Sequence, residues 1–177
     1  MSASDAEPSV RVLITEAEIT TRLEERAREI SRDYEGKDLV LVCVLKGSMV
    51  FFADLARKIT TPLSFDYICV SSYDSGTESE GSPELRTDLS EPVSGRHVLI
   101  VEDIVDTGLT MEYLFDLLAS RGAASLKVVA LLDKPARRKR EVEIAYRGFE
   151  IPDEFVVGYG LDYRQRYRNL PYIGSLE

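Results

Sequence analysis

The sequence predicts an α/β domain built on a mostly parallel, twisted sheet that is flanked by helices. Runs with strand character recur along the chain, at 38–45, 63–71, 97–101 and 126–132, and helical patterns separate them. Such alternation is typical of βαβ units. The run at 38–45 is continuously aliphatic and β-branched, which suits a strand buried on both faces, and the runs at 97–101 and 126–132 are also predicted to be buried strands. With a length of 177 residues and no linker or repeat, the chain is expected to form one domain over 1–177.

The first helix is predicted over 16–34. Thr15 and Glu18 have the spacing of a capping box, which satisfies backbone N–H groups at a helix start. Apolar side chains then recur at helical spacing, at Ile19, Leu23, Ala27 and Ile30. Gly36 supplies a stop.

The remaining elements are separated by polar and glycine-containing breaks. Lys46-Gly47-Ser48 ends the first strand, and helices are predicted over 49–59 and 110–120, the second of which is closed by Gly122. Ser94-Gly95 makes a turn before the strand at 97–101. Shorter strands are predicted at 85–89, 142–146 and 155–159, before an aromatic and arginine-rich tail at 162–177.

Two segments are expected to lack regular structure. Residues 1–9 form a flexible tail. Residues 74–84 are polar and glycine-rich, and a loop of this length in a compact domain is usually a functional lid or a disordered surface segment. The two interpretations are compatible.

Composition excludes several classes of function. The formal net charge of −9 argues against a nucleic-acid partner, which needs positive surface. No apolar run approaches the roughly 20 residues of a membrane span, and the N-terminus lacks the features of a signal peptide. Cys43 and Cys69 lie in apolar runs, which favours buried, reduced thiols and a cytoplasmic location. His97, the one histidine, is assigned no role.

The most informative segment is Val98–Thr110, with the sequence VLIVEDIVDTGLT. The strand delivers Glu102 and Asp103 at its end, where ligands bind in open α/β sheets. Adjacent acids can accept hydrogen bonds from ribose hydroxyls and hold Mg²⁺. The loop Asp106-Thr107-Gly108-Leu109-Thr110 then opens a helix, and its N–H groups and hydroxyls suit a phosphate. Helix capping alone would explain one of the acids, but not three at the exit of an apolar strand.

Two other phosphate-binding motifs are absent from the sequence. The chain has neither G-x-x-x-x-G-K-[ST] nor a G-x-G-x-x-G after a strand. VLIVEDIVDTGLT instead resembles the phosphoribosyl-pyrophosphate (PRPP) signature of the type I phosphoribosyltransferase family, in the version of members that act on 6-oxopurines. The resemblance runs from about residue 10 to the C-terminus. It implies the family fold, which adds a small base-binding hood to the sheet.

The resemblance also assigns roles around the PRPP. Glu102 and Asp103 would bind the ribose hydroxyls and magnesium, and Asp106 would be the general base or acid at N7 of the purine. The loop 106–110 would hold the 5′-phosphate. Pyrophosphate would contact Lys46, Gly47, Arg137 and Arg168, with Arg137 aligned to within a residue. From the residues alone, Lys46 is equally a lysine at a strand end, and Arg168 is a surface arginine paired with an acid.

The purine would contact a second group of residues. Lys134 would read the 6-oxo group, Phe155 would stack on the base, and Val156 would offer backbone groups to the base edge. Asp162 would hold a second magnesium or contact the base. Without the resemblance, Lys134 is a plain surface lysine and Phe155 is a core aromatic. Ser72 and Tyr73 match the start of the family's mobile lid, and the peptide between Leu45 and Lys46 would be cis.

The resemblance therefore implies a magnesium-dependent transferase of purine salvage. It would convert hypoxanthine to IMP and guanine to GMP with PRPP and release pyrophosphate. Family members form dimers or tetramers, so a homodimer or homotetramer is expected. Two alternatives stay open: a catalytically silent regulator that binds PRPP or a nucleotide, and an enzyme with another acceptor, such as xanthine or a pyrimidine.

Overall fold

The computed structural model describes residues 9–72 and 83–177. Its centre is a six-stranded sheet with the order β4-β3-β2-β5-β6-β7. The strands are β2 (Leu39–Leu45), β3 (Leu63–Ser72), β4 (Pro83–Thr87), β5 (His97–Val105), β6 (Ser125–Asp133) and β7 (Ile144–Glu150). All neighbours are parallel except β3 and β4, which are antiparallel. The predicted mostly parallel α/β fold is thus confirmed.

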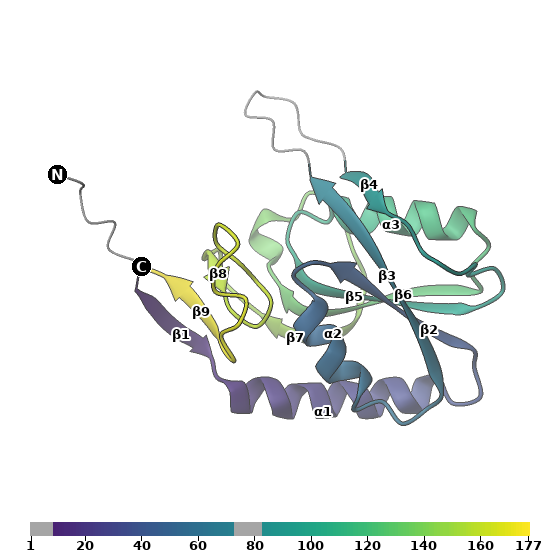
Figure 1. Ribbon diagram of the computed structural model, residues 1–177, viewed down its shortest axis with the longest axis horizontal. Coiled ribbons are helices and arrows are strands. Elements are labelled where there is room, and N and C mark those ends of the chain that lie inside the picture. The colour runs from purple at the N-terminus through teal and green to yellow at the C-terminus, as the bar shows by residue number, and fades with distance from the viewer. Residues whose placement is uncertain (1–8, 73–82) are drawn as a thin grey trace.

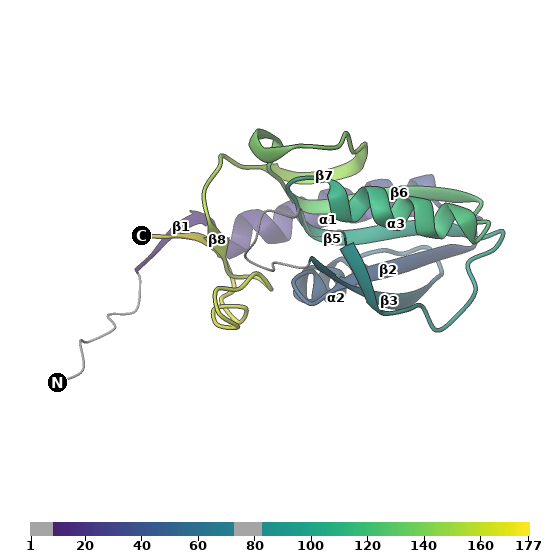
Figure 2. The same cartoon turned by 90° about the horizontal axis from the view of Figure 1, so that it is seen from above.

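Helices cover both faces of this sheet (Figures 1 and 2). α1 (Glu16–Asp33) and α2 (Met49–Ala56) pack on one face and α3 (Leu109–Ser120) packs on the other. The odd-numbered residues Leu39 and Leu41 of β2 join the first core, and the even-numbered Val40 and Val42 join the second. Because successive side chains of a strand point to opposite faces, a continuous apolar run supplies both cores.

α1 follows its sequence signals closely. Thr15 and Glu18 form the predicted capping box: the Thr15 N–H donates to the Glu18 carboxylate at 2.8 Å, and the Glu18 N–H donates to Thr15 Oγ1 at 3.3 Å. The four predicted apolar positions are the buried residues of the helix. No helix in the described part of the chain is long and apolar enough to cross a membrane.

A second, three-stranded sheet stands beside the main one and carries both described ends of the chain (Figure 1). β9 (Ile173–Leu176) lies between β1 (Val10–Ile14) and β8 (Val156–Val157), and both pairings are antiparallel. It forms the predicted hood. The Tyr159 hydroxyl donates to Asp54 of α2 at 2.6 Å, which ties the hood to the main domain.

Several predicted boundaries were wrong. β5 continues past Val101 to Val105 because β6 pairs with it through Val105↔Asp133, so Glu102 and Asp103 lie within the strand. Further along, β7 starts at Ile144, two residues after the predicted start, and ends at Glu150. α2 ends at Ala56 rather than at residue 59, and α3 begins at Leu109, one residue before its predicted start. β4 lies two residues before its predicted range of 85–89, and of the strand predicted at 155–159 only Val156–Val157 forms β8. Of the predicted tail at 1–9, Ser9 is described, and its carbonyl accepts a hydrogen bond from the Glu177 N–H.

Candidate active site

The strand order places the predicted site at a topological switch point. From β2 the chain continues outward to β3 and β4, then returns to β5 on the other side of β2. Ligands of open α/β sheets bind at such a point, outside the carboxyl ends of the strands. Here the end of β2, with Lys46 and Gly47, lies beside the end of β5, with Glu102–Asp106.

Gly47 shows how closely the two strand ends approach. A Cβ atom at this position would lie 1.6 Å from Oδ2 of Asp103. The peptide between Leu45 and Lys46 is cis, as the resemblance implied. Glycine at position 47 leaves the space in which the Asp103 carboxylate lies against the loop after β2.

Replacing Gly47 with alanine should displace the Asp103 carboxylate, because the new methyl group would occupy its place. The contact is with a side-chain end, so the fold should persist. We expect kcat/KM for PRPP to fall by about tenfold or more, which is the scale of a lost charged interaction. Activity assays beside thermal melts check this, and full activity in a folded variant would contradict it.

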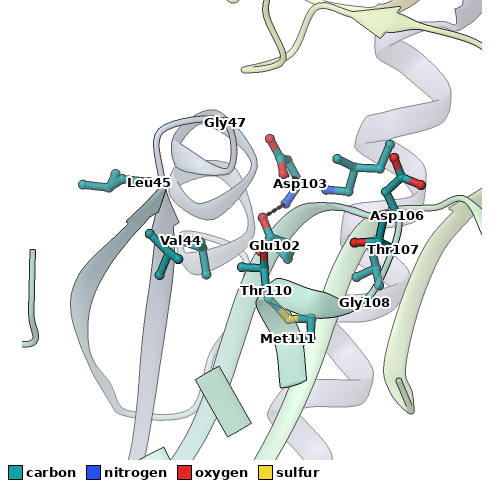
Figure 3. Close-up of a pocket in the computed structure, with 13 residues that line it drawn as sticks. Val44, Leu45, Gly47, Glu102, Asp103, Asp106, Thr107, Gly108, Thr110 and Met111 are labelled. Carbon is teal, nitrogen blue, oxygen red and sulfur yellow. Dashed lines mark hydrogen bonds between the residues drawn. The ribbon is translucent and has the colours of Figure 1, made fainter. Parts of the chain in front are cut away.

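Two pockets share this junction. The first, of about 220 Å³, is lined by the acid pair and the loop after it (Figure 3). It contains the predicted residues Glu102, Asp103, Asp106, Thr107, Gly108 and Thr110. Leu109, predicted to lie in the same phosphate loop, does not line it. The Leu109 N–H faces Thr107 Oγ1 at 3.4 Å.

The second pocket, of about 490 Å³, lies between the strand ends and the hood. It is lined by the residues predicted for pyrophosphate and purine, namely Lys46, Gly47, Lys134, Arg137, Phe155, Val156, Asp162 and Arg168. Both pockets include Gly47, Asp103 and Asp106. They therefore form one continuous site with Asp106 at the boundary.

Glu102 and Asp103 form a pair of acids, of which Glu102 is buried and Asp103 partly buried. Glu102 is only 7% exposed, and the Asp103 N–H donates to its Oε1 at 3.2 Å (Figure 3). Among the described residues neither carboxyl forms an ion pair. Burial, together with the neighbouring Asp103 carboxylate, raises the pKa of Glu102 well above its ordinary value. Burial also raises the pKa of Asp103.

This pair fits a divalent cation. A buried carboxyl beside a second, partly buried one is costly when both are charged, and a hard cation with oxygen ligands reverses that cost. The described residues contain no cluster of three acidic, histidine or cysteine side chains suited to a metal. Asp162 is instead ion-paired with Arg168 at 2.7 Å and accepts a hydrogen bond from the Gln165 N–H. Its predicted magnesium would be separate from that of the acid pair.

Asp106 presents an unsatisfied oxygen to the site. Its Oδ1 is buried and has no hydrogen-bond partner among the described residues. Buried polar atoms are nearly always paired, so such an atom at the boundary of two pockets points to a ligand partner. Its placement agrees with the predicted role in proton transfer.

Lys134 and Phe155, which the resemblance assigns to the purine, both line the second pocket. Lys134 is only 5% exposed although it is charged, and its Nζ lies 3.5 Å from Asp153. Phe155 is 56% exposed, and its ring meets that of Tyr163 edge-on with centroids 5.8 Å apart. The interpretations of Lys134 as a plain surface lysine and of Phe155 as a core aromatic were therefore wrong.

The predicted cations differ in their surroundings. Lys46 is exposed. Arg168 is paired with an acid, as its alternative interpretation held, and its Nη1 also donates to the Gly160 carbonyl at 2.7 Å. Arg137 is exposed and binds Asp153 at 2.6 Å. This guanidinium lowers the pKa of Asp153.

Sequence reasoning missed two residues that contact site residues without lining either pocket. Asp153 bridges Arg137 and Lys134, and its signal in the sequence was its position two residues before Phe155. Arg138 contacts the backbone of the phosphate loop, but it is one of four adjacent basic residues, Arg137-Arg138-Lys139-Arg140, which the sequence does not distinguish. Of the predicted lid, Ser72 ends β3, whereas Tyr73 and most of 74–84 lie outside the described residues.

Comparisons with known proteins show which family the chain belongs to. A family model described as phosphoribosyl transferase domain matches residues 14–164. The chain is 52% identical over 166 residues to hypoxanthine-guanine phosphoribosyltransferase of Staphylococcus aureus, covering 94% of this chain and 93% of that protein.

Two solved structures that are similar to this chain are hypoxanthine phosphoribosyltransferases. A hypoxanthine phosphoribosyltransferase from Staphylococcus aureus superposes with a TM-score of 0.90 at 51% identity, covering 94% of this chain and 91% of that one. A mutant hypoxanthine phosphoribosyltransferase from Trypanosoma cruzi in a ternary substrates complex has a TM-score of 0.88 at 44% identity and covers 96% of each chain.

Proposed function

The chain belongs to the phosphoribosyltransferase family, and from this premise we propose that it joins hypoxanthine or guanine to the ribose of PRPP. The C1–O bond to pyrophosphate breaks, a C1–N bond to the purine forms, and IMP or GMP is released with pyrophosphate. The observation that carries this proposal is the position of Asp106 between two pockets, one suited to a ribose phosphate and the other to a purine and pyrophosphate.

The first pocket would hold the phosphoribosyl group. Thr107 and Thr110 supply hydroxyls, and the loop into α3 supplies N–H groups near a helix N-terminus, which together favour a phosphate. Glu102 and Asp103 would bind the ribose hydroxyls and hold Mg²⁺. When bound, Mg²⁺ would neutralise negative charge on PRPP and on the leaving pyrophosphate.

The second pocket would hold the base and the pyrophosphate. Lys134 donates a hydrogen bond to the 6-oxo group, Phe155 stacks on the ring, and Val156 or Asp162 meets the base edge. An ammonium donor favours an oxo group and rejects the amino group of adenine. Lys46, Arg137 and Arg168 stabilise the pyrophosphate as its charge develops.

Asp106 would manage the proton at N7 of the purine. Its unpartnered oxygen needs a proton donor, and a positioned carboxylate contributes about 10²–10⁴-fold as a general acid or base. The lid that begins at Ser72 and Tyr73 would exclude water from the reacting centre. That role remains a proposal carried by the resemblance.

Assembly and location are further parts of the proposal. We propose a homodimer or homotetramer. Its support is the exposure of three large apolar side chains, Met49 on α2 and Phe65 and Tyr67 on β3. Soluble monomers rarely expose large apolar surfaces, so a second copy of the chain is expected to cover them. A cytoplasmic location is supported by Cys43 and Cys69, which are both free thiols.

The transfer is tested by product analysis. Purified protein is incubated with PRPP, Mg²⁺ and hypoxanthine or guanine, and nucleotide and pyrophosphate are quantified. We expect IMP or GMP and pyrophosphate in equal amounts. Binding of PRPP or GMP without any product would reject the transferase and favour the silent regulator.

A further inference from the structure

The phosphate loop after β5 is held from one side by residues 134–140. The Val105 carbonyl accepts a hydrogen bond from the Lys134 N–H at 3.0 Å. The Thr107 carbonyl accepts hydrogen bonds from the N–H groups of Lys139 and Arg140, at 2.8 and 3.0 Å. Gly108 packs so closely on this segment that a Cβ atom there would lie 2.4 Å from the Arg140 carbonyl oxygen.

One side chain completes this support. Arg138 donates from Nε to the Asp106 carbonyl at 2.9 Å and from Nη2 to the Val105 carbonyl at 3.1 Å. The same guanidinium is ion-paired with Asp133. The Arg138 side chain is 18% exposed and that of Asp133 only 3%. Arg138 lines neither pocket, so it reaches the loop from outside the site.

The geometry of the peptide group links these contacts to the site. In a trans peptide the C=O and the following N–H point in opposite directions within one plane. Fixing the carbonyls of Val105, Asp106 and Thr107 toward residues 134–140 therefore directs the next three N–H groups away from that segment. Within the described chain the N–H groups of Thr107 and Gly108 donate to no protein acceptor, and both residues line the first pocket.

We propose that Arg138 is a positioning residue for the transfer reaction. By holding the carbonyls of Val105 and Asp106, it fixes the peptides on both sides of Asp106, which orients the Thr107 N–H toward the 5′-phosphate and sets the direction of the Asp106 side chain. This inference rests on the proposed function. It explains why the Arg138 side chain is only 18% exposed while that of its neighbour Arg137 is exposed.

The structure offers a matched control for Arg138. Asp133 also binds Arg147, with Nε 2.9 Å from Oδ2, and the Arg147 side chain is 50% exposed. Losing either arginine leaves Asp133 with one cation, but Arg147 has no contact with the loop 105–108 among its described hydrogen bonds and ion pairs. If the loss of one cation beside Asp133 were enough to impair the protein, replacing Arg138 and replacing Arg147 would impair it equally.

The experiment compares Arg138→Lys, Arg138→Met and Arg147→Met. Lysine keeps the charge beside Asp133 but cannot reproduce the planar fork on three acceptors. For Arg138→Lys we expect kcat to fall about 10–100-fold and the Kd of GMP to rise about tenfold, from the loss of charged hydrogen bonds. The KM for hypoxanthine should stay within about twofold, and so should every parameter of Arg147→Met. If Arg138→Met does not fold, the lysine variant carries the test.

Two results would overturn the inference: full activity and GMP affinity in Arg138→Lys, or equal losses in Arg147→Met. Failure of the proposed function would look different, because the wild type itself would then make no nucleotide. In that case GMP affinity alone would still decide whether Arg138 orders the phosphate loop.

Discussion

Replacing Asp106 with asparagine is expected to lower kcat by about 10²–10⁴-fold and to change KM for PRPP far less. Asparagine keeps the shape of the side chain but cannot take up the purine proton. The unpartnered Oδ1 at the boundary of the two pockets is the atom that would do so. Steady-state kinetics with PRPP and hypoxanthine measure the effect, and Asp106→Ala should show a similar loss.

Asp116→Asn on the exposed face of α3 is a suitable control for this change. It makes the same substitution in a residue that lines neither pocket, so its kcat should equal that of the wild type. If Asp106→Asn also turned over at the wild-type rate, Asp106 would not be the proton-transfer residue.

Replacing Lys134 with alanine is expected to damage recognition of the base selectively. The buried ammonium would be the donor to the 6-oxo group, and a hydrogen bond from a charged donor is worth about 1.5–3 kcal/mol, or roughly 10–100-fold. The KM for hypoxanthine should rise by that factor, whereas the KM for PRPP should stay within about twofold. Discrimination against adenine should weaken as well.

Lys127→Ala serves as the matched control, since Lys127 lies on β6, the strand that ends just before Lys134, and is exposed and lines neither pocket. Equal increases in KM for base and PRPP in the Lys134 variant would show that the whole site is distorted. Lys134 would then lose its assigned role in reading the base.

The main sheet could be predicted from sequence because its signals are local. A capping box with four apolar positions at helical spacing defines α1, and continuous apolar runs define β2, β5 and β6. Of the small sheet, β8 lies within a strand predicted at 155–159, whereas the hood as a unit was expected only through the resemblance. β1 and β9 pair Val10 with Leu176 across almost the whole chain, and no local pattern encodes a partner at that separation.

The residues of the site were likewise predictable where a local motif contains them and unpredictable where their role depends on contacts made in the fold. Residues in quoted motifs, such as Lys46, Asp106 and Phe155, were predicted and lie around the two joined pockets. Residues that act through packing were not predicted. The role of Arg138 depends on which carbonyls its guanidinium meets, and four adjacent basic residues do not reveal which one turns inward.

The most direct test of base selection is a turnover assay at saturating PRPP with hypoxanthine, guanine, xanthine and adenine in parallel, with and without Mg²⁺. We expect rapid, magnesium-dependent release of pyrophosphate with hypoxanthine and guanine and none with adenine. Release with adenine, or no release with any of the four bases, would contradict the assignment of the site to 6-oxopurine transfer.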